Sequence, residues 1–411
     1  MKHFTSLASV VCVCLLSVNP GTAQTTHSIE QGANYAQDVY FSLETGIVAT
    51  VPADNWDIAL EVTNPFAIGI RINDGNGREL AVYPNGDLSA WNTVDSTGFS
   101  TWPKRNNGLD LWETGAFNTG FSGDPMDFGW GVYSGPPLHQ VVGDSLYIFK
   151  RADGSALKLR INDLSNGLWS FTYADLDGAN ETTSTIAMAD YAERNFVYFH
   201  FADGVVDREP ATGTWDLVFT RYVGPTQYGL FPTTGILLNR DRAAAEGDGV
   251  DVNAAVHTDY TLTTDSIVTI GNDWKSLVNF MWQIDGDRVY FVQTGSGAIH
   301  KLIFTGFTGS STGITTFTSE VASAVGIAES PASAIQIYPN PVTGNTLYLS
   351  GCSATSTAEV WSLAGARIAS LPAQAAPGTP ATVALDGLPA GTYLIRVADG
   401  TATSTHRIVI L

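Results

Sequence analysis

Cysteine and basic residues are both scarce in this chain of 411 residues. Two of its three cysteines lie near the start, so removal of residues 1–23, argued below, leaves Cys352 alone. A single cysteine excludes a disulfide within the chain and any cysteine-based zinc or iron–sulfur site. Lys and Arg number 20 against 40 Asp and Glu, a formal charge of −20. Such a surface repels nucleic acid and anionic membranes, so neither is expected as a partner.

Long hydrophobic runs are missing after the first segment, so we expect no transmembrane segment in the mature chain. The first segment begins with Lys2, continues through an apolar stretch from Leu7 to Val18, and ends in the small residues Gly21-Thr22-Ala23. That stretch is shorter than the roughly 20 residues of a spanning helix. Residues 1–23 are therefore predicted to be a secretory signal peptide.

Strand signals dominate the rest of the chain. Short runs of Val, Ile, Tyr, Phe and Thr are bounded by Gly, Asp and Asn, and no 3.6-residue apolar period is sustained. Glycine (41) and proline (18) suit many tight turns, such as Asn73-Asp74-Gly75. These patterns predict an all-β protein.

One aromatic block occurs twice in the same order. Val39-Tyr40-Phe41 and Trp56-Asp57 return as Val197-Tyr198-Phe199 and Trp215-Asp216. Tyr-Phe, a glycine, a β-branched residue and Trp-Asp are typical of a hairpin whose aromatic side chains fill the core. The aspartate is then expected to accept hydrogen bonds from turn amides.

A second block, around Tyr147, recurs around Tyr290 and predicts another core hairpin in each copy. We therefore expect two homologous antiparallel β-domains, residues 28–182 and residues 185–323. Residues 324–333, rich in small residues, are predicted to be a linker.

Residues 334–411 predict a small β-sandwich of the immunoglobulin type, because six or seven short strands follow one another closely. The motifs of this module are Tyr338, Pro339, Asn340, Pro341, the turn Leu363-Ala364-Gly365, Gly391, Tyr393 and Arg407. With these motifs the module resembles the type A sorting domain of type IX secretion cargo. The resemblance implies a Gram-negative cell of the Bacteroidota type, with the type IX secretion machinery as partner. It also implies a route through the periplasm and the outer membrane, removal of the module, and release or attachment to surface lipopolysaccharide.

Further matches in the two repeats are Gly129-Trp130 and Asp273-Trp274-Lys275. Together with the Tyr-Phe and Trp-Asp pattern, they make residues 35–321 similar to the HmuY family of secreted haem-binding proteins. The resemblance implies two tandem HmuY-like domains, haem as a cofactor, and haem or a haemoprotein as a partner.

The family's histidine, about five residues after the tryptophan, is replaced by Gly135 in the first repeat and by Asn279 in the second. Histidine and methionine are the side chains that haem iron takes in such sites. The candidate haem ligands are Met126 and His139, which flank Trp130, and His257 and Met281, which flank Trp274.

Two other functions stay open from the sequence. One is a surface module without haem, either structural and adhesive or binding another ligand. The second is a secreted hydrolase, since 40 carboxylates could supply an acid–base pair. Neither Gly-x-Ser-x-Gly nor His-Glu-x-x-His occurs, so we expect no enzyme and no catalytic residues. Residues 175–178 and 248–251 have calcium-like acidic spacing, but turns are favoured and no metal site is expected.

Overall fold

The computed structural model describes residues 24–119, 123–226, 229–323, 336–342, 344–350, 357–362, 366–372, 381–399 and 402–411. The predicted signal peptide, the predicted linker and the Leu363-Ala364-Gly365 turn lie outside these residues. Contacts divide the chain into two units, Met1–Ala324 and Val325–Leu411.

Both units consist of antiparallel sheets joined by short turns, so the all-β prediction is confirmed. The described helices are all 3-10 turns: η1 (Ala33–Tyr35), η2 (Asp74–Asn76), η3 (Leu88–Asn92), η4 (Phe99–Thr101), η5 (Met188–Tyr191), η6 (Thr212–Thr214), η7 (His257–Asp259) and η8 (Gly309–Ser311). None of the helices in the described ranges has the length and apolar character needed to cross a membrane.

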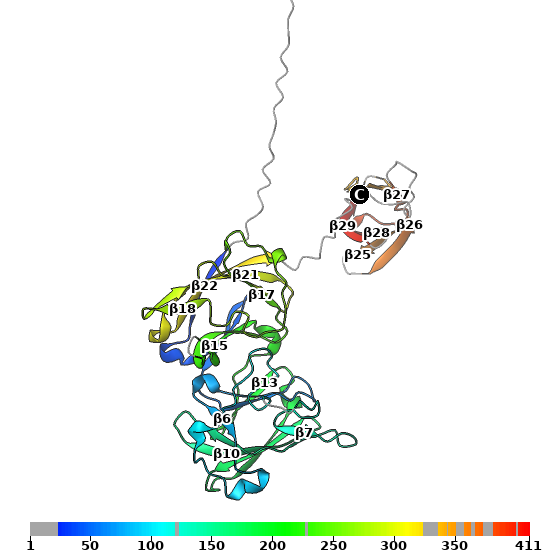
Figure 1. The fold of residues 1–411 in the computed structure, drawn as a ribbon. Coiled ribbons are helices and arrows are strands. Elements are labelled where there is room, and N and C mark those ends of the chain that lie inside the picture. Colours follow the sequence, from blue (N-terminus) through cyan, green and yellow to red (C-terminus); the bar gives the residue numbers. More distant parts are fainter. Residues whose placement is uncertain are drawn as a thin grey trace, which may run out of the picture. The chain divides into compact units, whose positions relative to one another are not determined.

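Two large sheets lie in the first unit (Figure 1). One has the order β1 (Thr25–Glu30), β22 (Ile314–Ser323), β21 (Ile299–Phe307), β20 (Val289–Gln293) and β17 (Ala244–Gly247). The other has the order β12 (Thr182–Ala187), β11 (Leu168–Asp175), β10 (Ala156–Ser165), β8 (Val141–Gly143) and β7 (Gly131–Tyr133), with β9 (Tyr147–Lys150) on β10 and β6 (Glu79–Val82) on β9.

Smaller sheets complete the first unit. One contains β14 (Gly204–Val206), β13 (Phe196–His200), β4 (Ile58–Glu61) and β5 (Ile70–Ile72). Another contains β16 (Gly229–Leu238), β15 (Leu217–Thr226), β2 (Gln37–Ser42) and β3 (Gly46–Pro52). β18 (Lys275–Val278) and β19 (Met281–Ile284) form a two-stranded sheet of their own.

The hairpin that opens each repeat pairs with a strand of the other repeat. β2, from the β2–β3 hairpin, lies beside β15, with Phe41 opposite Leu217. β13, from the β13–β14 hairpin, lies beside β4, with Phe199 opposite Ile58. In Figure 1 the blue N-terminal strands accordingly lie among green and yellow strands. The sheets thus mix residues of both predicted domains, and the limits 28–182 and 185–323 of the duplicated sequence stay a prediction.

The aspartates of the repeated Trp-Asp motif stabilise this pairing of each hairpin with a strand of the other repeat. Asp57 accepts a hydrogen bond of 2.9 Å from the backbone N–H of Phe201. Asp216 accepts one of 2.9 Å from the backbone N–H of Leu43. The expected bonding of turn amides is confirmed, and in each case the amide belongs to the other repeat.

Aromatic side chains cross between the repeats in the same way. The Trp56 ring lies edge-on to Tyr198, and the Trp215 ring lies edge-on to Tyr40, each with centroids 5.0 Å apart. All four belong to one hydrophobic cluster that draws residues from both copies. Neither repeat therefore completes its core from its own residues.

The second predicted hairpin is found in both repeats. Tyr147 starts β9 and Tyr290 lies in β20, and both side chains are fully buried. Each strand turns into its partner, β10 or β21, at a glycine with positive φ, 88° at Gly154 and 94° at Gly297. Glycine suits these turns because it adopts positive φ without steric cost.

The second unit contains two sheets around one core. The first consists of β23 (Gln336–Tyr338), β24 (Thr346–Ser350) and β27 (Ala381–Ala384). The second consists of β26 (Arg367–Pro372), β25 (Thr357–Ser362), β28 (Gly391–Asp399) and β29 (Ala402–Ile410). Their buried side chains make a small sandwich, as the strand spacing predicts.

Candidate functional site

The β18–β19 hairpin has an unusual tip. Its strands are joined at Asn279 and Phe280, which have positive φ angles of 50° and 61°. This is the backbone of a type I′ turn, which fits the twist of a hairpin. Asparagine tolerates positive φ, whereas a bulky residue rarely adopts it. The strained turn places the Phe280 side chain in solvent, where it is 97% exposed.

Apolar side chains occupy both faces of this hairpin near its tip, whereas the pair Ser276 and Gln283 nearer the base is polar. Leu277 lies opposite Trp282 and Val278 lies opposite Met281. All four side chains are exposed, Met281 to 67%. No charged residue occurs between Lys275 and Asp285. A sheet face turned to water normally carries polar side chains, so an apolar hairpin in solvent is a candidate interaction surface.

The base of the hairpin is anchored in the core. Lys275 is buried, and its Nζ donates a hydrogen bond of 2.7 Å to the carbonyl of Thr234. The same Nζ lies 4.2 Å from the ring centroid of Trp274 and 4.8 Å from that of Phe307. Burial lowers the pKa of Lys275 to about 7. The Trp282 ring lies edge-on to Phe307 at 5.0 Å, so the exposed tip projects from a fixed support.

Carboxylates gather where the hairpin leaves the core. The guanidinium of Arg288 lies within ion-pair distance of Glu246 (3.0 Å), Asp248 (3.2 Å), Asp273 (2.7 Å) and Asp285 (3.4 Å). A carboxylate oxygen of Asp287 lies within 4.8 Å of oxygens of Asp248 and Asp285. Burial and the neighbouring carboxylates raise the pKa values of Glu246 and Asp285. Arg288 thus faces four carboxylates, and Asp287 lies beside two of them, so the group has an excess of negative charge.

The two acidic segments with calcium-like spacing are turns. Asp177 accepts a hydrogen bond of 2.9 Å from the backbone N–H of Ala179. Asp251 accepts one of 3.0 Å from the backbone N–H of Asn253. Each is the arrangement of an Asx turn, which is the interpretation that the sequence favours.

A corresponding hairpin follows Trp130 in the first repeat. The carbonyl of Trp130 accepts from the N–H of Asp144 at 3.3 Å, and that of Trp274 accepts from the N–H of Asp285 at 2.9 Å. β7–β8 and β18–β19 therefore leave the core at equivalent places. They differ because β8 also pairs with β10 and so joins the seven-stranded sheet.

The predicted haem ligands lie at or near these hairpins. Met126 and His139 meet at Tyr133, whose N–H donates to the Met126 carbonyl at 2.8 Å and whose hydroxyl contacts His139 Nδ1. Met281 lies on β19, and His257 begins η7 with its ring against Phe291. Both residues of the first pair thus contact Tyr133, Met126 through its backbone carbonyl and His139 through its ring, whereas no contact among the described residues joins the second pair. Ligation by either pair stays a prediction.

The middle of the first unit holds a polar cavity of about 50 Å³. Its lining includes Asp38 and Arg208, which form a buried ion pair, and Glu209. Glu209 accepts a hydrogen bond of 2.9 Å from the N–H of Phe196, and burial raises its pKa to about 7. Ligand pockets usually measure 300 Å³ or more, so this volume suits a few water molecules. We assign the Asp38–Arg208 ion pair to joining the two repeats, whereas Glu209 bonds within the second repeat.

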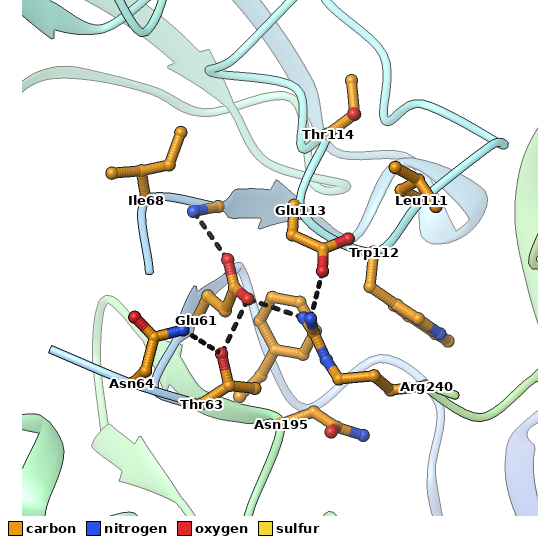
Figure 2. Close-up of polar contacts among 12 residues, drawn as sticks. Glu61, Thr63, Asn64, Ile68, Leu111, Trp112, Glu113, Thr114, Asn195 and Arg240 are labelled. Carbon is orange, nitrogen blue, oxygen red and sulfur yellow. Dashed lines mark hydrogen bonds and ion pairs between the residues drawn. The ribbon is translucent and has the colours of Figure 1, made fainter. Parts of the chain in front are cut away.

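Figure 2 shows a second polar link between the repeats. Arg240, just after β16, contacts Glu61 of β4 at 2.6 Å and also contacts Glu113. Glu61 accepts further hydrogen bonds from the N–H of Gly69 at 3.0 Å and from the hydroxyl of Thr63 at 2.9 Å. The buried carboxylate is fully partnered, which fits a structural role.

In the second unit, Asn340 ties the motif Tyr338-Pro339-Asn340-Pro341 to the last strand. Its Nδ2 donates to the carbonyl of Arg407 at 2.8 Å, and its Oδ1 accepts from the N–H of Val409 at 3.0 Å. The motif therefore closes onto β29, next to the predicted sorting residue Arg407.

The remaining motif residues lie on the strand beside β29. Gly391 and Tyr393 belong to β28 and pair with Ile410 and Ile408. The Tyr393 hydroxyl donates to the carbonyl of Pro389 at 2.9 Å, a contact like the tyrosine corner of immunoglobulin-type sandwiches. Asn340, Gly391, Tyr393 and Arg407 thus lie in or against the β28–β29 pair, whereas the ring of Tyr338 stacks on Tyr348.

Comparison with known families identifies this second unit. Residues 336–411 match the family model described as the secretion system C-terminal sorting domain. The unit is a type IX secretion C-terminal sorting domain, and the protein is exported to the cell surface or secreted. The likeness of the preceding repeats to HmuY stays a prediction.

Two further comparisons concern the whole chain. No curated protein matches it. A solved structure of PorZ, an essential bacterial surface component of the type-IX secretion system of Porphyromonas gingivalis, aligns with a TM-score of 0.16 and 9% identity. The alignment covers 71% of this chain and 51% of the PorZ chain, so this chain spans about half the length of that structure.

Sequence reasoning missed the β18–β19 hairpin as a surface. It singled out Met281 and Asn279 in connection with haem and treated apolar runs as core strands. The available signal is Asn279 itself, which interrupts an apolar run and favours a two-residue turn.

Proposed function

We propose that this protein is a non-catalytic binding protein of the bacterial surface to which export delivers it, with the β18–β19 hairpin as its contact surface. The observation that carries the proposal is the apolar tip at Phe280 and Met281, exposed in water on an anchored base. Leaving such a side chain exposed forgoes about 1.5–3 kcal/mol that burial provides. A partner that covers the tip gains that free energy, as the aromatic anchors of interfaces do.

Binding of the purified, labelled exported protein to cells of the producing bacterium that lack its gene tests the proposal. We expect saturable binding that weakens at least about tenfold in Phe280→Ser/Met281→Ser. Leu230→Ser/Phe231→Ser is the matched control, because these β16 side chains are also exposed, Phe231 to 60%. Equal weakening by both double variants, or no saturable binding, overturns the proposal.

Haem capture is the second hypothesis, favoured by the nearness of Met126 and His139 in the fold, since both contact Tyr133. Methionine and histidine are an adequate axial pair for haem iron. The test is titration of the exported protein with haemin. Ligation predicts a Soret band that sharpens stoichiometrically and weakens in His139→Ala or His257→Ala, and a featureless titration discards the hypothesis.

A further inference from the structure

The β18–β19 hairpin is convex at its tip, and this shape limits what can receive it. Phe280 projects from the two-residue turn and Met281 follows it at the start of β19, and Leu277 and Trp282 broaden the apolar surface behind them. An apolar projection of this kind is buried most completely in a complementary cleft.

The base of the same hairpin carries uncompensated negative charge. Asp273 precedes β18 and Asp285 follows β19, so both carboxylates lie at the base of the hairpin, one beside each strand. Together with Glu246 and Asp248 they lie within ion-pair distance of the guanidinium of Arg288, and Asp287 lies beside Asp248 and Asp285. The side chains of Asp248 and Asp273 are exposed, so their charge is accessible to a partner that covers the tip and reaches the base of the hairpin.

Building on the proposed function, we infer that the partner is a different protein with an apolar cleft that receives Phe280 and a basic rim that faces Asp248 and Asp273. A cationic rim complements the carboxylates and speeds encounter at low salt.

The charges at this hairpin disfavour two other binding partners, an anionic lipid surface and a second copy of this chain. An anionic lipid surface is attracted to Lys and Arg, and the one lysine of this hairpin, Lys275, is buried with its Nζ bonded to Thr234. A second copy would bring two acidic bases together, and like charges across an interface cost free energy.

Photo-crosslinking from the tip tests the inference. The exported full-length protein carrying benzoylphenylalanine at position 280 is bound to cells lacking the gene and irradiated, and the adduct is identified by mass spectrometry. We expect an adduct with a different protein, which unlabelled wild type competes away and unlabelled Met281→Asp does not. Benzoylphenylalanine at position 231 is the matched control and should not give this adduct.

The basic rim is tested with Asp248→Asn/Asp273→Asn, which keeps polar contacts to Arg288 but removes two charges. Its adduct yield should fall about threefold to tenfold at low salt, and the difference should vanish near 1 M salt, where charges are screened within about 3 Å. The inference is overturned, while the proposed function stands, by any of three results. These are a protein adduct whose yield does not change in the charge variant, an adduct with lipid, and an adduct with a second copy of this chain. If cell binding does not depend on the hairpin at all, both the proposed function and this inference are overturned.

Discussion

The carboxylate of Asp57 accepts a hydrogen bond of 2.9 Å from the backbone amide of Phe201, 144 residues further along the chain. Asp216 makes the equivalent contact in the opposite direction. Each carboxylate also binds an arginine, Arg78 at 3.0 Å and Arg242 at 2.7 Å. All four side chains are buried. Each aspartate therefore forms an ion pair within its own repeat and accepts a hydrogen bond from a backbone amide of the other repeat.

Replacing either aspartate should therefore destabilise the whole first unit. Asp57→Ala and Asp216→Ala should each lower the free energy of unfolding by about 3 kcal/mol, because a buried arginine loses its counter-ion. Urea unfolding followed by tryptophan fluorescence measures the change. Asp207→Ala, which removes an exposed ion pair with Arg194, is the control and should change little. Equal stability of all three variants would contradict the cross-linking role.

Because each hairpin pairs with a strand of the other repeat, we expect that neither repeat folds alone. Residues 24–182 lack β13, the neighbour of β4, and residues 185–323 lack β2, the neighbour of β15. Each fragment should give the NMR spectrum of an unfolded chain, and mixing the two should restore dispersed peaks. Cooperative folding of residues 24–182 by themselves would show that the exchanged contacts are dispensable.

Strand positions were accessible from the sequence, whereas strand partners were not. Alternating apolar residues and turn glycines are local signals, and they located the hairpins at Tyr147 and Tyr290. The Tyr-Phe motif occurs in both copies, so the sequence offers Trp56 two equivalent partners. In the folded protein Trp56 packs against Tyr198 of the other copy and not against Tyr40, and no local sequence pattern distinguishes the two partners.

The candidate site was less accessible for a related reason. An apolar run such as that from Leu277 to Trp282 has the composition of a core strand. Such a run is buried only if another element of the fold covers it, and the sequence of the run does not indicate whether one does. The sorting residues were easier to locate, because Asn340 and Tyr393 belong to a compact motif in one small unit.

Glu209 makes the stability of the first unit depend on pH. Burial raises its pKa from 4.5 to about 7, so the native state binds its proton more tightly than the unfolded chain does. The free energy of unfolding should therefore fall as pH rises from about 4.5 to about 7, by about 3 kcal/mol. Glu209→Gln, which still accepts from the Phe196 amide, should abolish this fall in urea titrations between pH 5 and pH 8. An unchanged pH slope in that variant would exclude Glu209 as the cause.

Lys275 predicts the opposite slope in the next pH window. Burial lowers its pKa from 10.5 to about 7, so between these values the unfolded chain binds more protons than the native state. The free energy of unfolding should rise with pH from about 7 to about 10.5 through this group. Lys275→Met keeps an apolar contact with Trp274 and should remove the rise. Urea unfolding at pH 7, 8, 9 and 10 measures both slopes, and a rise that persists in Lys275→Met rules out this origin.

Asn340 links the start of the sorting unit to its last strand, and its removal should impair export. Asn340→Ala loses the bonds to the Arg407 carbonyl and the Val409 amide, worth about 1 kcal/mol each. A less stable unit should leave less protein at the surface and in the medium and more in the periplasm. Asn340→Asp keeps an acceptor for Val409 and should fall between wild type and alanine, while deletion of residues 336–411 should abolish export. Immunoblots of the three fractions measure these amounts. Wild-type export of the alanine variant would mean that the sorting machinery reads the unit without this closure.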